Sequence, residues 1–398
     1  MASGQVDGRP AKYARKMIGE RFDAGQNSTG FDYLRIGLSS AICLWHAWWV
    51  FAGQMAWHLP IWSGWLNFIP KAFVPLFFAL SGFLVAGSLE RNRLHHFLLL
   101  RALRIVPALA FEVVASACLI GLVFTALPPV RYVASPEFRL YFLNIIGFIH
   151  VTLPQVFPGN PLPNLMNPQL WTIPFELECY LAISVLAVLG FVWRRYYLAL
   201  AVLAFVVLGT LYTVWKPNFS AQSAIEGHIP GKILVLVFLT GVLLYRHRAH
   251  IPYNNWLGLA SLLAMAIVFR FPTLYYFSAL PVAYFAVWVG LKQPPAIPFG
   301  DLSYGVFLFH FPITQMVMAL GGKSLTWWVF GPLSLVASAL CAAVSWRLIE
   351  KPLLANKRAI LGWVDNTWSR LRAPVLRPAP EIASGGDQEA PRSGPKSV

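Results

Sequence analysis

Charged side chains are scarce in this chain. Asp, Glu, Lys and Arg make up only 12% of its 398 residues, whereas hydrophobic residues make up 57%. A soluble globular domain carries about 25% charged residues. The composition therefore excludes an ordinary soluble domain. A mean hydropathy of +0.59 predicts an all-α, polytopic integral membrane protein.

Cysteine is also rare, and its placement argues against a metal site. The four cysteines are Cys43, Cys118, Cys179 and Cys341, and each stands within an apolar run without metal-ligand spacing. We interpret them as small buried hydrophobic residues and expect no metal. The first thirty residues are polar and basic, which differs from a cleavable signal.

Two further absences narrow the function. No internal repeat is evident, which disfavours a secondary transporter built from inverted halves. The run around Ser81 and Gly82 lacks the glycines that flank the serine of a nucleophile elbow. The net charge of +15 comes from basic residues grouped in loops and tails, so we read it as a topology signal and expect no nucleic-acid partner.

Apolar runs of spanning length recur along the chain. A membrane-spanning helix needs about 20 mostly apolar residues. We expect about ten, near 31–54, 67–88, 100–127, 168–192, 196–215, 230–247, 253–271, 273–291, 299–320 and 325–349. Basic residues gather in the N-terminal tail, in alternate loops and after Arg347, which predicts that both termini are cytoplasmic.

Three regions are expected outside these helices. Residues 1–30 form a basic cytoplasmic tail, residues 31–352 the membrane domain, and residues 353–398 a cytoplasmic, largely disordered tail. A long outer loop, 128–167, includes an apolar stretch at 138–151 that is too short to span. We expect a re-entrant or interfacial helix there; the loop is either a functional lid or a connector.

The first span carries an arginine and a histidine. Arg35 and His46 are eleven residues apart, so at about 100° per residue they share a helix face and lie roughly 16 Å apart along the axis. Ionisable groups at such depths are costly and usually serve function.

Two later spans add ionisable groups at a similar depth. Glu176 and His310 are expected in the central to outer zone, where they and His46 form one polar site. The alternatives are that His46 is a helix–helix hydrogen-bond donor, that His310 belongs to a structural turn or kink before Phe-Pro, and that Glu176 only pairs with a basic neighbour. Glu178 lies about 200° from Glu176, so only one of them faces such a site, and we favour Glu176.

Arg101 and Arg104 form a cationic pair on the cytoplasmic side. At i, i+3 they share a helix face, and arginine binds phosphate through a planar fork. They are either topology anchors or ligands of a phosphate-rich cosubstrate. Ser81 and Gly82 permit close approach of a neighbouring helix or of a ligand.

These motifs together resemble the membrane-bound acyltransferase 3 family. The resemblance rests on six stretches that occur in order: Asp32-x-x-Arg35-x10-His46, Phe77-Phe-Ala-Leu-Ser81-Gly82-Phe-Leu, Arg101-Ala-Leu-Arg104-Ile-Val-Pro107, Leu170-Trp-Thr-Ile-Pro-Phe-Glu176, Ser303-Tyr-Gly-Val-Phe-Leu-Phe-His310-Phe-Pro-Ile and Arg347-Leu-Ile-Glu350-Lys351-Pro352. It implies a ten-helix enzyme that transfers an acyl group, acetyl above all, from cytoplasmic acyl-coenzyme A to a hydroxyl or amine. The resemblance implies that Arg35 and His46 are essential for activity and that Arg101 and Arg104 take part in coenzyme A handling.

The expected acceptor is a carbohydrate, glycolipid or small molecule at the outer face of a bacterial inner membrane. His46 is expected to act as general base or acyl relay, with Arg35, Glu176 and His310 as further catalytic residues, and Arg101, Arg104 and Ser81 in donor binding. Membrane lipids are the other partner, and a homo-oligomer is left open. The alternatives are a transporter or flippase of a glycan or glycolipid and a noncatalytic scaffold, neither of which needs coenzyme A.

Overall fold

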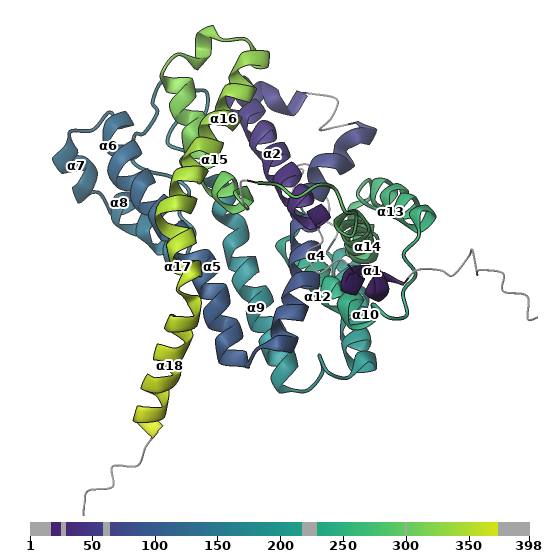
Figure 1. Cartoon of the computed structure of the whole chain (residues 1–398). Helices are drawn as coiled ribbons and strands as arrows, with labels where there is room; N and C mark the ends of the chain where they lie inside the picture. The colour runs from purple at the N-terminus through teal and green to yellow at the C-terminus, as the bar shows by residue number, and fades with distance from the viewer. Residues whose placement is uncertain (1–16, 25–28, 59–63, 217–228, 299–300, 373–398) are drawn as a thin grey trace, which may run out of the picture. The chain divides into compact units, whose positions relative to one another are not determined.

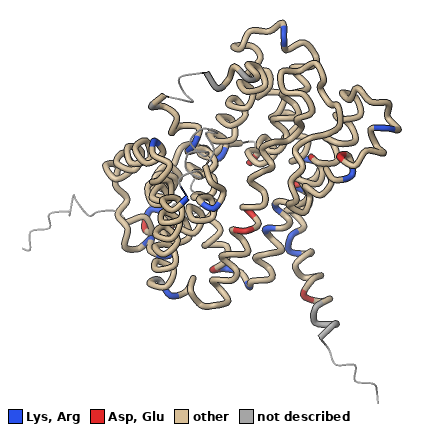
Figure 2. The backbone as a smooth tube through the Cα atoms, turned by 180° about the vertical axis from the view of Figure 1, so that it is seen from behind, with Lys and Arg blue, Asp and Glu red and all other residues tan. Residues whose placement is uncertain are grey.

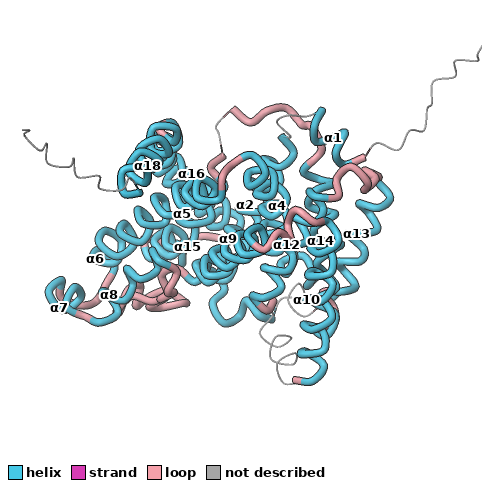
Figure 3. The backbone as a smooth tube through the Cα atoms, turned by 90° about the horizontal axis from the view of Figure 1, so that it is seen from below, coloured by secondary structure: helices cyan, strands magenta, loops and turns pink. Residues whose placement is uncertain are grey.

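The computed structural model describes residues 17–24, 29–58, 64–216, 229–298 and 301–372. These residues form helices and loops but no β-strand (Figure 3). Residues up to Ala355 make one compact unit, and Asn356–Val398 make a second, of which the structure describes one helix. The all-α prediction is therefore confirmed.

The first half of the chain supplies the helices that carry the arginines. The elements are α1 (Ile18–Ala24), α2 (Thr29–Ala52), η1 (Gly53–His58), η2 (Trp65–Asn67), α4 (Phe68–Arg91), α5 (Leu94–Ala115), η3 (Ser116–Ile120), α6 (Gly121–Phe124), α7 (Pro129–Ala134), α8 (Pro136–Tyr141), η4 (Phe142–Ile146), η5 (Pro168–Thr172) and α9 (Ile173–Val188). α5, η3 and α6 are continuous, with η3 a π-helical turn.

The second half completes the bundle (Figure 1). Its elements are α10 (Arg195–Trp215), α12 (Gly231–Arg246), α13 (Asn255–Val268), η6 (Pro272–Ser278), α14 (Ala279–Gly290), α15 (Ser303–Ala319), η7 (Gly322–Ser324), α16 (Trp327–Ser345), η8 (Trp346–Glu350), α17 (Lys351–Ala355) and α18 (Lys357–Arg372).

Six of the described helical segments are long and apolar enough to cross a membrane: Phe68–Arg91, Leu94–Phe124, Pro168–Val188, Tyr196–Trp215, Pro272–Gly290 and Trp327–Ala355. Charged positions are sparse along the backbone of these helices (Figure 2). The chain is therefore an integral membrane protein. Helices also occupy the other four expected positions. However, α12, α13 and α15 have only 16, 14 and 17 residues, and α2 carries polar groups. The count of ten spans stays a prediction.

α15 has a central place in the bundle, and this positions the candidate site. It packs against α2, α16 and α5. Nearly every residue from Leu308 to Gln315 is fully buried, including His310, Thr314 and Gln315. Because α15 buries polar groups among three neighbours, those groups must find partners within the protein.

The outer loop is built from short pieces rather than one helix. α8 and η4 divide the apolar stretch at 138–151, and Gly147, with φ +89°, ends the second of them. A left-handed glycine terminates a helix readily because it lacks Cβ. This explains why the stretch does not continue as the single element that the sequence analysis expects.

The expected C-terminal tail contains one described helix. Residues 357–372 form the helix α18. Its apolar residues recur at helical spacing, as in Ile360 and Val364, with basic residues at its start. That pattern is the local signal for a helix, and the polar composition of the whole tail obscured it. Residues 373–398 lie outside the described part of the chain.

The closest helix contact in the described core joins α4 and α12. A Cβ added at Gly82 would lie 2.0 Å from the carbonyl oxygen of Phe238, and one added at Gly241 would lie 2.3 Å from that of Ala79. Backbone therefore packs on backbone at this crossing, and only glycine fits.

We expect Gly82→Ala to destabilise the protein by about 1–3 kcal/mol, because overpacking forces the two backbones apart. Thermal unfolding of the purified protein in detergent measures this effect. Gly37→Ala is the matched control, since a Cβ at this helical glycine meets nothing within 4 Å. Equal melting temperatures for the two variants would contradict the close crossing.

Candidate functional site

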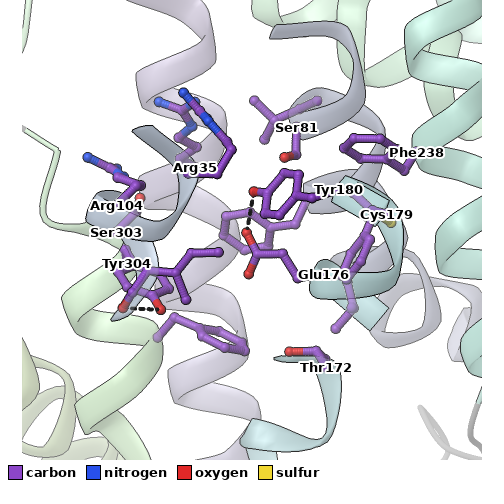
Figure 4. A pocket seen from close by; sticks show the side chains of 17 residues that line it. Arg35, Ser81, Arg104, Thr172, Glu176, Cys179, Tyr180, Phe238, Ser303 and Tyr304 are labelled. Carbon is purple, nitrogen blue, oxygen red and sulfur yellow. Dashed lines mark hydrogen bonds between the residues drawn. The ribbon is translucent and has the colours of Figure 1, made fainter. Parts of the chain in front are cut away.

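A cavity of about 140 Å³ lies between α2, α4, α5, α9, α12 and α15. Figure 4 shows Arg35 and Arg104 toward one end, Thr172 at the other, and Glu176 and Tyr180 between them. Its walls are mostly apolar and aromatic, formed by Val74, Phe77, Phe78, Leu80, Ile105, Phe238, Tyr304 and Phe307. The structure thus brings together Arg35, Ser81, Arg101, Arg104 and Glu176, five of the seven predicted site residues.

Asp301 links two of the arginines at one end of this cavity. Its Oδ2 accepts hydrogen bonds from Arg35 Nη1 at 3.2 Å and from Arg104 Nη2 at 2.5 Å. Its Oδ1 accepts hydrogen bonds from the backbone N–H and the hydroxyl of Ser303, at the start of α15. The carboxylate is therefore fixed by the helix and holds two guanidinium groups in place.

The sequence analysis missed Asp301. The available signal was an acidic residue directly ahead of the Ser303-Tyr304 motif, at the cytoplasmic end of an expected span. A carboxylate at that position is a natural partner for an intramembrane arginine.

Arg101 lines the same cavity one turn before Arg104 on α5. Its Nε is buried without a hydrogen-bond partner. Glu350, which is buried in η8, interacts electrostatically with Arg104 and Asp301. The terminal motif that includes Glu350 therefore belongs to the surroundings of the arginine cluster.

Glu176 lies deeper in the cavity. Tyr180, one turn further along α9, donates a hydrogen bond from its hydroxyl to Glu176 Oε1 at 2.7 Å (Figure 4). Glu178 lies outside this cavity and pairs with Lys232 on an exposed face, at 2.7 Å. The structure thus places the two carboxylates on different faces, with Glu176 toward the cavity.

His46 and His310 form a pair. His46 Nδ1 and His310 Nε2 are 2.7 Å apart, and the two rings are nearly parallel, at 8° with centroids 5.0 Å apart. His310 is fully buried, whereas His46 is half-buried. Aromatic rings surround the pair: Phe311 meets His46 edge-on at 5.7 Å, and Trp49 lies 6.2 Å from it.

The two histidines and Glu176 do not form a single cluster. The histidines pair with each other, and the carboxylate of Glu176 bonds Tyr180 in the cavity. Neither histidine lines the cavity, but Phe307 does, and its carbonyl oxygen lies 2.8 Å from His310 Nδ1. α2 and α15 therefore contribute residues both to the arginine-lined cavity and to the histidine pair.

A second buried carboxylate was missed by the sequence analysis. Glu112 on α5 is fully buried and accepts hydrogen bonds from Ser116 and Asn167. Asn167 also donates to the Tyr141 hydroxyl at 2.7 Å, and Gln169 donates to the Leu308 carbonyl at 2.8 Å. These bonds fasten the end of the outer loop to α5 and α15.

A carboxamide pair fastens the middle of the same loop. Asn160 donates to the side-chain oxygen of Gln315 at 2.9 Å, and Gln315 donates to the carbonyl oxygens of Leu162 and Leu165 at 2.7 and 2.9 Å. The loop thus covers the part of α15 that follows His310, so it is placed to border any route to the histidine pair from that side.

Comparisons with known proteins agree with this arrangement. The family profile described as "Acyltransferase domain", of the acyltransferase 3 type, matches residues 28–347. The chain is 28% identical over 365 residues to "Nodulation protein 10" of Rhizobium leguminosarum bv. viciae, covering 83% of this chain and 94% of that protein. It is 24% identical over 292 residues to "O-acetyl transferase" of Shigella phage Sf6, covering 71% and 84%.

No solved structure matches the chain. The family match spans the arginine cavity and the histidine pair, from the start of α2 to η8, and so takes in every predicted site residue. The chain belongs to the acyltransferase 3 family, and it is a membrane acyltransferase.

Proposed function

We propose that this enzyme transfers an acyl group, acetyl in the first place, from acyl-coenzyme A to a hydroxyl of a carbohydrate acceptor. One observation carries the proposal: in a chain of this family, α2 presents Arg35 to an arginine-lined cavity and His46 to a histidine pair. The relative named O-acetyl transferase supports acetyl transfer to oxygen. The carbohydrate acceptor rests on the resemblance to polysaccharide-modifying members of the family.

The arginine end of the cavity suits the phosphates of the donor. Arg35, Arg101 and Arg104 all line it, and Arg101 Nε has no partner there. Guanidinium groups bind phosphate by charge-assisted, bidentate hydrogen bonds. The apolar walls beyond them suit the pantetheine arm, and the roughly 16 Å between Arg35 and His46 along α2 is comparable to its extended length.

The proposed chemistry is attack of the acceptor oxygen on the thioester. His46 takes the hydroxyl proton while the oxygen forms a bond to the carbonyl carbon. The carbon–sulfur bond then breaks, and the leaving thiolate takes up that proton. The products are the acyl ester and free coenzyme A. The buried surroundings of the pair limit competing hydrolysis by water.

The proposed orientation puts donor and acceptor on opposite sides of a bacterial inner membrane. The arginine cluster and both termini face the cytoplasm, and the loop at 128–167 faces outward. The fastening of this loop to α5 and α15 through Glu112 and Gln315 supports a role at the acceptor side.

We expect His46→Ala to lower acyl transfer by about 10²–10⁴-fold, the usual loss on removing an acid–base group. Product formation in isolated membranes, normalised to the amount of protein, measures this. His150→Ala in the outer loop is the matched control. Activity within about threefold of wild type would remove His46 from the chemistry.

We expect alanine substitutions of Arg101 and Arg104 to raise the KM for acyl-coenzyme A more than that for the acceptor, because the forks bind donor phosphates. Lysine should rescue only in part, since it lacks the planar fork. Steady-state kinetics with each substrate varied in turn measures both constants. Arg131→Ala, on the exposed face of α7, controls for loss of positive charge. Unchanged donor binding in the double alanine variant would show that the two arginines serve as topology anchors and do not bind the donor.

We expect the two ends of the site to be reached from opposite sides of the membrane. In a background without the four native cysteines, Pro161→Cys should react with an impermeant thiol reagent in intact cells. Arg93→Cys should react only after the cells are opened, because the positive-inside rule places it in the cytoplasm. Both positions are exposed. Labelling of Arg93→Cys in intact cells would invert the topology and exclude a cytoplasmic donor.

A further inference from the structure

The hydrogen bonds of the histidine pair determine where its protons lie, and their part in the reaction rests on the proposed function of His46 as the base. His310 Nδ1 lies 2.8 Å from the carbonyl oxygen of Phe307 and 3.2 Å from that of Val306. A carbonyl oxygen only accepts hydrogen bonds, so Nδ1 of His310 must carry the proton. In a neutral imidazole the other nitrogen, Nε2, is then an acceptor.

The proton on the neighbouring ring follows from this assignment. His310 Nε2 is 2.7 Å from His46 Nδ1, so this contact is a hydrogen bond only if His46 Nδ1 donates. The lone pair of His46 then resides on Nε2. A charged His310 would reverse this bond. However, His310 is fully buried, with the ring of Phe307 beside it, and carrying a charge there in the resting state is costly.

We propose that His310 is a positioning residue that keeps the lone pair of His46 on Nε2, and that the two imidazoles share the positive charge that arises when His46 takes the proton of the acceptor hydroxyl. The fully buried His310 has no surface to offer a substrate, whereas His46 is half-buried. His46 thus contacts the reacting atoms, whereas His310 acts only through its hydrogen bond to His46.

The proton balance of the step is simple. His46 Nε2 accepts the hydroxyl proton, and the Nδ1 proton moves toward His310 Nε2. The positive charge then spreads over both rings, and the Phe307 and Val306 carbonyls stabilise it at His310 Nδ1–H. When the carbon–sulfur bond breaks, the Nδ1 proton returns to His46 and Nε2 gives its proton to the thiolate. A neutral histidine backed by backbone carbonyls thus takes the place that a carboxylate holds in a catalytic triad.

Two isosteric substitutions separate this role from a merely structural one. In His310→Gln the side-chain amide reaches the position of Nε2 and can accept from His46. In His310→Asn the amide mimics Nδ1 and bonds the carbonyls, but leaves His46 Nδ1 without its acceptor. We expect kcat to fall about 10-fold in the glutamine variant and about 100-fold or more in the asparagine variant, with both KM values within about twofold.

A structural role predicts the opposite order, because asparagine preserves the bonds to α15. Equal activities, or a more active asparagine variant, would overturn the proposal. Melting temperatures of both variants show whether each is folded, and His150→Gln, whose imidazole also bonds a backbone carbonyl outside the site, is the control. The double variant His46→Ala/His310→Asn should be no slower than His46→Ala, because His310 acts only through His46.

Nitrogen NMR of the full-length protein in lipid nanodiscs reads the protonation directly. With ¹⁵N-histidine labelling, and assignment by loss of signals in His46→Gln and His310→Gln, we expect both rings to be protonated at Nδ1 near neutral pH. A His46 protonated at Nε2 would refute the assignment. An inactive His46→Ala together with a fully active His310→Asn would refute the inference and leave the proposed function intact, whereas an active His46→Ala would remove both.

Discussion

The packing of α2 against α15 is the constraint on which the site depends. Arg35 meets Asp301 at the start of α15, and His46 meets His310 further along it. The two contacts occur in the same order on both elements, so the helices run in the same direction. Arg35 and His46 are eleven residues apart on α2, whereas Asp301 and His310 are nine residues apart. Asp301 precedes Ser303, the first residue of α15. One helix pair therefore fixes both the ionic end of the site and its histidines.

Charge balance explains how three arginines can lie together in the interior of the protein. Burying a guanidinium group without a partner is costly, and Asp301, supported by Asp32 at 3.6 Å from Arg35, meets that need. Three arginines line the cavity, whereas Asp301 bonds only Arg35 and Arg104 directly. Arg101 keeps a buried Nε–H without a hydrogen-bond partner, so one donor of the cluster remains unsatisfied.

The sequence predicted where helices occur along the chain better than it predicted which residues meet across the bundle. Apolar runs located the helices within a few residues, and the 100° rule placed Arg35 and His46 on one face of α2, toward α15. The expected depth in the membrane suggested that Glu176 lies beside the histidines. Depth gives only the position along the membrane normal, and it does not say which neighbouring helix a side chain faces. Asp301 and Glu112 were missed because their partners are far away in the chain: 266 residues separate Arg35 from Asp301.

α2 and α15 hold the site rigidly, so any change in access to it has to involve the outer loop. Sliding α2 along α15 would break the ionic contact and the histidine contact together, so this motion is disfavoured. The outer loop, by contrast, is held by carboxamide bonds at Asn160 and Asn167 and contains only short helical turns. These bonds join buried groups, so breaking them requires that water enters and solvates the donors and acceptors. Any opening of this loop therefore has to be compensated by new contacts, whereas α2 and α15 keep the arginine cluster and the histidine pair in place.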